Sequence, residues 1–157
     1  MAIVFENITK CPLCNDILNT EKEYIMTPNL ITNQLDEFSL LSDVGIHTEC
    51  LDRSPLKSRL IKFIDQYENS LKEMRRLVDK YNPREIINFN LLSSNESEPL
   101  YKYNYFLIPR QNLTEWNEYE DFIEHANAFL SEGKWKSVNG FNYLEYFLNT
   151  VKNISNT

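Results

Sequence analysis

The most regular hydrophobic pattern of the chain lies in its middle third. Apolar side chains recur there at alternating intervals of four and three residues, at Leu60, Ile64, Tyr67, Leu71, Met74, Val78 and Tyr81. This spacing places them on one side of a helix and predicts a single long helix over about residues 55–81. Ser54 followed by Pro55 is typical of a helix start, and Asn82 followed by Pro83 is typical of a helix end.

The apolar seam of this helix has two interpretations. It covers other elements of its own chain, or it pairs with a second copy in a coiled-coil dimer. Tyr67 and Tyr81 are unusual at seam positions of a dimeric coiled coil, which favours packing within one chain. The sequence leaves the oligomeric state open between monomer and dimer.

Alternating apolar positions follow in residues 86–92 and 100–108, with a polar segment between them. They predict a β-hairpin that ends at Pro109. In the second strand Tyr101, Tyr103 and Tyr105 would share one face. That face is either part of the core or an exposed interface, because tyrosine is common in both settings; the core is favoured for at least part of it.

Two amphipathic helices are expected after the hairpin. The first would begin with Thr114 as its N-cap and end at Gly133. The second would cover residues 141–152, with Phe141 and Tyr146 among its buried positions.

Residues 1–54 contain no long periodic run. Short apolar stretches at residues 2–5, 17–18, 23–26 and 30–31 are separated by polar and turn-forming residues, which favours short strands. Residues 34–42 fit either a helical turn or a strand.

All three cysteines and one of the two histidines lie in two clusters of this segment. Cys11 and Cys14 form a C-x-x-C pair, and His47 and Cys50 lie three residues apart, as they would on one helix face. Cys₃His is a common ligand set of structural zinc sites, so we expect these four side chains to hold one Zn²⁺. The alternatives are unrelated buried cysteines or a disulfide; neither accounts well for three cysteines and a histidine in two such pairs.

The order of CPLC, an intervening span long enough for a hairpin, and HTEC resembles the treble-clef zinc finger over roughly residues 9–55. In that family a zinc knuckle supplies two ligands and the first turn of a helix supplies two more. The resemblance implies a scaffold and a structural zinc ion. It does not specify an activity, because treble clefs occur in nucleic-acid-binding proteins, nucleases and interaction modules.

These patterns together predict an α+β protein. It would consist of a treble-clef-like zinc module in residues 1–54, a long amphipathic helix in residues 55–82, and a β-hairpin packed with two helices in residues 83–157, all forming one unit. A hydrophobic fraction of 42% with 13% aromatic residues can build such a core. The chain contains no apolar run of about 18 residues, and its start lacks the pattern of a signal peptide, so we expect no membrane association and a cytoplasmic location.

The net charge of −7 is unevenly distributed. Residues 1–50 carry eight acidic and two basic side chains, residues 51–84 carry five and nine, and residues 85–157 carry ten and five. An acidic chain suits a basic partner better than the phosphates of a nucleic acid. On the basic helix, Glu68–Lys72 and Arg75–Asp79 also have the spacing of ordinary solvent-exposed ion pairs.

Motifs of enzyme chemistry are absent from the sequence: it has no phosphate-binding loop, dinucleotide-binding motif or nucleophile elbow. An HNH-like nuclease would need further histidines, and only His125 remains, four residues after Asp121. We therefore predict a non-enzymatic, zinc-stabilised binding protein that docks a macromolecular partner. A narrower hypothesis is an acidic immunity or inhibitor protein directed against a basic toxin or nuclease. The alternative is a zinc-finger nucleic-acid-binding regulator, and an HNH-like nuclease ranks third.

Overall fold

The computed structural model describes residues 2–137 and 140–155, which form an α+β fold with two small antiparallel sheets. The sheets pair β1 with β2 and β3 with β4. The elements, with η denoting a 3₁₀ helix, are β1 (Tyr24–Met26), η1 (Glu37–Leu41), β2 (Gly45–His47), α1 (Thr48–Asp52), α2 (Lys57–Val78), η2 (Pro83–Glu85), β3 (Ile86–Asn88), η3 (Pro99–Tyr103), β4 (Leu107–Pro109), η4 (Arg110–Glu115), α3 (Tyr119–Ser131) and α4 (Tyr143–Ser155).

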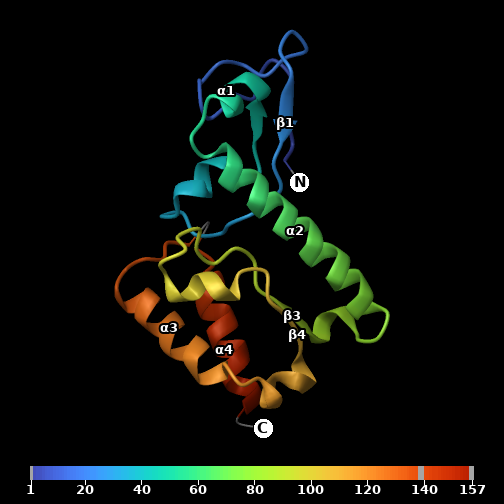
Figure 1. Ribbon diagram of the computed structural model, residues 1–157, viewed down its shortest axis with the longest axis vertical. Coiled ribbons are helices and arrows are strands. Elements are labelled where there is room, and N and C mark those ends of the chain that lie inside the picture. Colours follow the sequence, from blue (N-terminus) through green and yellow to red (C-terminus); the bar gives the residue numbers. More distant parts are fainter. Residues whose placement is uncertain (1, 138–139, 156–157) are drawn as a thin grey trace.

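The buried apolar side chains form two clusters. In Figure 1, β1 and α1 lie at one end of the molecule, α3 and α4 lie at the other, and α2 runs obliquely from beneath α1 toward β3 and β4. The N-terminal core comprises Cys11, Leu18, Leu30, Ile31, Phe38, Leu41, Ile46, Leu51, Leu60, Phe63 and Leu91. The C-terminal core comprises Ile87, Phe89, Leu92, Leu100, Tyr103, Ile108, Leu113, Phe122, Ala126, Phe129, Trp135, Leu144, Phe147, Leu148 and Val151.

The long central helix exists, and it packs against its own chain. It covers Lys57–Val78, whereas the predicted range was 55–81. The helix begins later than predicted because Ser54 caps a preceding turn, in which its side chain accepts a hydrogen bond from the backbone N–H of Leu56 at 3.2 Å. Leu60 and Phe63 are buried in the N-terminal core, whereas Val78 near the other end is exposed. The first half of the helix therefore contributes most to the core.

The predicted hairpin is confirmed only where its strands meet. Ile87 of β3 pairs with Ile108 of β4, but the strand predicted for residues 100–105 is wrong, since most of this stretch forms the 3₁₀ helix η3. Pro99 favours a helical start, and the Asn104 side chain accepts hydrogen bonds from the N–H groups of Leu92 and Ser93, at 2.7 and 3.2 Å. The chain is thereby held in a turn instead of a strand.

The three tyrosines consequently do not share one face. Tyr103 is buried in the C-terminal core, while Tyr101 and Tyr105 pack against the N-terminal core from the other side. Tyr105 adopts a positive φ of 58°, which interrupts the alternation expected of a strand. These side chains contribute to the interior of the protein and do not form a common exposed surface.

The C-terminal helices are present with shifted starts. Thr114 lies within η4 and does not cap α3, which begins at Tyr119. Gly133 ends α3 as predicted: it has a φ of 68°, and the following N–H of Lys134 returns to the carbonyl of Phe129 at 3.1 Å.

Helix α4 begins at Tyr143, two residues later than predicted. Asn142 caps it by accepting a hydrogen bond from the N–H of Glu145 at 3.1 Å. Phe141 and Tyr146 are exposed, contrary to the prediction, because Phe141 precedes the helix and Tyr146 lies on its outer side.

Asn33 joins the N-terminal half to the segment that follows α3. Its side-chain amide donates to the carbonyl of Lys134 at 2.9 Å, and its Oδ1 accepts from the N–H groups of Lys136 and Leu35, at 3.0 and 3.1 Å. Asn33 is buried, so these bonds are shielded from water.

Across the described ranges, no helix is sufficiently long and apolar to cross a membrane.

Candidate metal centre

The first two ligand candidates lie on a tight turn near the N-terminus. The N–H of Cys11 donates to the carbonyl of Asp16 at 2.9 Å, and the N–H of Asn15 donates back to the carbonyl of Cys11 at 2.8 Å. Asn15 adopts a φ of 63°, a left-handed conformation that asparagine tolerates better than most residues. We call residues 10–17, which are closed by a bridge between Lys10 and Ile17, the knuckle.

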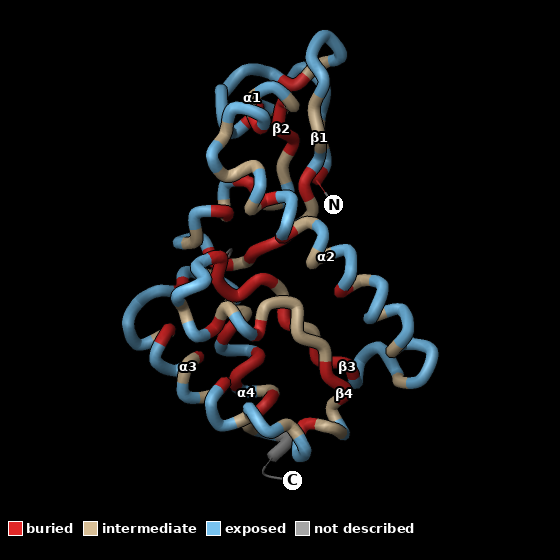
Figure 2. The backbone as a smooth tube through the Cα atoms, viewed as in Figure 1, coloured by how far each residue is buried: buried red, intermediate tan, exposed pale blue. Residues whose placement is uncertain are grey.

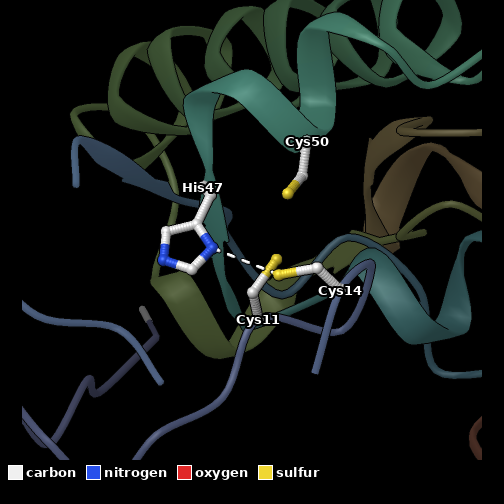
Figure 3. A group of neighbouring side chains, drawn as sticks. All are labelled: Cys11, Cys14, His47 and Cys50. Carbon is white, nitrogen blue, oxygen red and sulfur yellow. Dashed lines mark hydrogen bonds between the residues drawn. The ribbon is translucent and has the colours of Figure 1, made fainter. Parts of the chain in front are cut away.

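The other two candidates lie where a strand leads into a helix. Antiparallel pairing of β1 with β2 places His47 opposite Tyr24, and α1 begins at the next residue. Cys50 is therefore in the first turn of α1, on the side that faces the knuckle (Figure 3). Gly45 permits this approach, because an added Cβ there would meet Leu18 Cδ1 and lie 2.8 Å from Val4 Cγ2.

The structure brings all four predicted ligands together. One donor atom from each of Cys11, Cys14, His47 and Cys50 lies within 4.8 Å of every other (Figure 3). Four donors bound to one ion at about 2.3 Å would lie about 3.8 Å apart, so the observed separations are compatible with four ligands of a single ion. The cysteines are free thiols that converge, and they are neither scattered in the core nor joined in a disulfide.

The surroundings of the cysteines affect their protonation differently. Burial opposes ionisation of Cys11, but hydrogen bonds from the backbone N–H groups of His47, Leu13 and Cys14 outweigh it and lower the pKa of this thiol. Desolvation, with hydrogen bonding and repulsion involving Cys14 and Cys11, raises the pKa of Cys50 to about 11. Three thiolates so close together repel one another, and a bound divalent cation would offset that repulsion.

His47 presents one ring nitrogen to the cluster. Its Nδ1 lies 3.3 Å from Cys14 Sγ, while its Nε2 is buried without a hydrogen-bond partner in the described part of the chain. A metal ion on Nδ1 would fix the tautomer that carries its proton on Nε2. Three thiolates and an imidazole are donors that suit zinc, so the cluster is compatible with one such ion.

The remaining histidine lies away from this centre, on α3. Asp121, four residues before His125, approaches Lys102 at 3.6 Å, and no contact between Asp121 and His125 is present among the described residues. Within residues 2–137 and 140–155, the Cys₃His cluster is the one group of three or more potential metal ligands.

The positive charge of the basic segment, residues 51–84, is largely paired with carboxylates of the same chain. Five of its nine basic side chains form ion pairs, namely Arg53–Glu49, Lys57–Asp52, Arg59–Glu37, Lys62–Glu96 and Arg76–Glu73. The two pairs predicted along α2 do not form: Lys72 contacts Asn69 at 3.3 Å, and no ion pair joins Arg75 to Asp79 within the described ranges. The positive charge of this helix is thus directed mostly at neighbouring carboxylates.

The sequence interpretation missed a group of exposed apolar side chains beside the knuckle. Ile3, Phe5 and Ile8 are among the most exposed large hydrophobic residues of the chain. Residues 2–5 are all apolar, so the sequence predicted a short strand there and gave no signal that Ile3 and Phe5 are exposed. Comparisons of the chain with protein-family models, curated proteins and solved structures give no match.

Proposed function

We propose that Cys11, Cys14, His47 and Cys50 hold one structural zinc ion in a treble-clef-like module. The convergence of these four donors carries the proposal. The order of a knuckle, a β1–β2 hairpin and a helix that supplies the last ligand from its first turn also supports it. Four protein ligands would fill a tetrahedral ion and leave no position for a substrate, as in structural zinc sites.

We further propose that the protein is a non-enzymatic binding protein that docks a basic protein partner. The net charge of −7, with six excess acidic groups in residues 1–50 and five in residues 85–157, favours such a partner. A toxin or nuclease inhibited by this chain would fit that description. Thiolate ligands need a reducing compartment, which makes the cytoplasm the proposed location.

The first experiment measures metal content and partner capture with the same protein. Elemental analysis of the purified chain should give one zinc per molecule. The immobilised protein should retain a positively charged protein from nuclease-treated lysate of the source cell, and added salt should release it, because the contact is electrostatic. A control column carrying the chelator-treated protein should retain less.

Two other outcomes would redirect the proposal. Capture of nucleic acid from untreated lysate, with an affinity that falls steeply as salt increases, would instead support the zinc-finger regulator. Cleavage of DNA or RNA in the presence of Mg²⁺ would support the nuclease. Retention of only neutral or acidic proteins would overturn the proposed charge preference.

A further inference from the structure

Residues 2–5 alternate between side chains that face the protein and side chains that are exposed. Ala2 is buried and Val4 packs against the N-terminal core, whereas Ile3 and Phe5 are 75% and 62% exposed. Ile8, in the turn that follows, is 74% exposed. Such exposure of three large apolar side chains in six residues is not explained by packing inside this chain.

These side chains adjoin the knuckle. The N–H of Asn7 donates to the carbonyl of Leu18 at 3.0 Å, and the N–H of Leu18 donates to the carbonyl of Thr9 at 2.8 Å, so the two segments run side by side. The knuckle itself exposes two more apolar side chains. We call the whole set the knuckle face, and it consists of Ile3, Phe5, Ile8, Leu13 and Ile17.

The segments that carry the knuckle face are anchored on the N-terminal core, through Val4, Cys11 and Leu18. Figure 2 shows that the loops beside β1 and α1 are mostly exposed, whereas β2 is buried. Clusters of exposed apolar side chains on soluble proteins usually mark places where another molecule binds. Leu13 lies between two of the candidate metal ligands, so a bound ion would hold it in a fixed position.

Carboxylates adjoin this apolar surface and restrict its partner. Ile17 lines a hollow of about 420 Å³ in which two carboxylates, Asp16 and Glu21, are matched by Lys10 and Lys22. Glu6 follows the exposed Phe5 in the chain. Glu6, Glu21 and Glu23 make no ion pair in the described part of the chain, while Asp16 approaches Lys22 at 3.7 Å. Residues 3–23 together carry four carboxylates against two lysines, so this part of the chain has a net negative charge. Anionic lipid and nucleic acid are therefore poor matches, and a basic protein segment is a good one.

We infer that the knuckle face docks a protein segment that carries both apolar and basic side chains. This inference rests on the proposed function and assigns its binding surface. The partner's apolar side chains cover Phe5 and Ile8, and its lysines or arginines face the surrounding glutamates. The metal centre positions the knuckle half of the surface.

The test uses fluorescently labelled peptides of 14 residues as probes, and fluorescence anisotropy measures their binding to the full chain. One peptide alternates leucine with lysine, a second alternates leucine with glutamate, and a third alternates serine with lysine. The wild type should bind the first at least ten-fold more tightly than either of the others. The double variant Phe5→Ser/Ile8→Ser should bind it at least ten-fold more weakly than the wild type.

A matched control removes exposed leucines elsewhere. Leu35 and Leu40 are 55% and 71% exposed, so Leu35→Ser/Leu40→Ser changes a comparable apolar area outside the knuckle face. This variant should bind the leucine–lysine peptide as the wild type does. Circular dichroism should confirm that both double variants remain folded, as expected for substitutions of exposed side chains.

The outcomes separate this inference from the proposed function. If the wild type prefers the leucine–lysine peptide but Phe5→Ser/Ile8→Ser binds it equally well, the surface is wrong and the preference for basic partners stands. If the leucine–glutamate peptide binds as tightly as the leucine–lysine peptide, the charge preference itself is wrong. Equal binding of the serine–lysine peptide would overturn the apolar docking. Dimerisation through the same face, seen by light scattering and lost in that variant, would also overturn it.

Discussion

Removal of one ligand without disturbing the core is the sharpest test of the metal centre. Cys14 is exposed, so Cys14→Ser deletes a thiolate while changing the packing very little. His47→Ala is the companion variant, although it also empties a buried position. His125→Ala is its matched control, because it removes the other histidine of the chain, which lies on α3 away from the cluster.

The expected loss of zinc-binding free energy can be worked out from the sharing of one ion among four ligands. Structural zinc binding in zinc-finger peptides is worth about 10–16 kcal/mol, so one ligand of four accounts for about 2.5–4 kcal/mol. This corresponds to zinc affinity about 10²–10³-fold weaker in Cys14→Ser and in His47→Ala. At a zinc concentration that saturates the wild type but not the variant, the free energy of unfolding of the variant should be lower by up to about 3–4 kcal/mol. This is a large part of a typical domain's stability.

Zinc affinity is measured by competition with a chromogenic chelator, and local stability by amide hydrogen exchange. In the two ligand variants, exchange should accelerate in residues 5–18 and 24–52, whereas α3 and α4 should stay protected because their core is separate. His125→Ala should leave zinc affinity unchanged. The four-ligand centre would be refuted by Cys14→Ser binding zinc with wild-type affinity.

Three substitutions test the fold around the site. Asn33→Ala removes three hydrogen bonds, two of them to residues 134–136, and at about 1 kcal/mol each should lower the free energy of urea unfolding by about 3 kcal/mol; an unchanged midpoint would contradict this. Gly45→Ala introduces a methyl group against Leu18 and should cost about 1–3 kcal/mol in thermal unfolding, and a neutral effect would show that the core adjusts. Gly133→Ala places a side chain at a φ of 68° with open space around it, so strain alone should cost about 1–2 kcal/mol; a larger loss in calorimetry would indicate an unseen contact.

The elements that were predictable from sequence are those fixed by local chemistry. Two short motifs of ligands contain the whole metal cluster, and the structure places their donors within 4.8 Å of one another. The central helix could be predicted because its apolar residues recur regularly over many turns. Gly133 ends α3 because a left-handed residue is needed there, which the sequence alone indicates.

The errors lie where distant residues determine the local structure. The alternation of residues 100–105 favours a strand, but Asn104 is held by the backbone of Leu92 and Ser93, and this contact is not visible in a local pattern. Thr114 has the chemistry of an N-cap, yet residues 110–115 continue from β4 as a 3₁₀ helix. The joining role of Asn33 depends on partners more than 100 residues away.

Helix α2 starts in the N-terminal core and reaches strand β4, and this placement determines how far the loss of a bound ion would extend. Leu60 and Phe63 from its first half belong to the N-terminal core, and Phe63 packs edge-on against Phe38 with ring centroids 5.1 Å apart. Farther along, Tyr67 contacts Tyr105, with ring centroids 6.3 Å apart, and both still pack against the N-terminal core. The turns of α2 that follow lie beside Phe106 and Leu107, at the start of β4. Loss of the ion should therefore loosen the first turns of α2 together with the knuckle, while later turns keep their support. A metal-dependent knuckle face joined to a metal-independent body would let the binding surface respond to zinc without unfolding the whole chain.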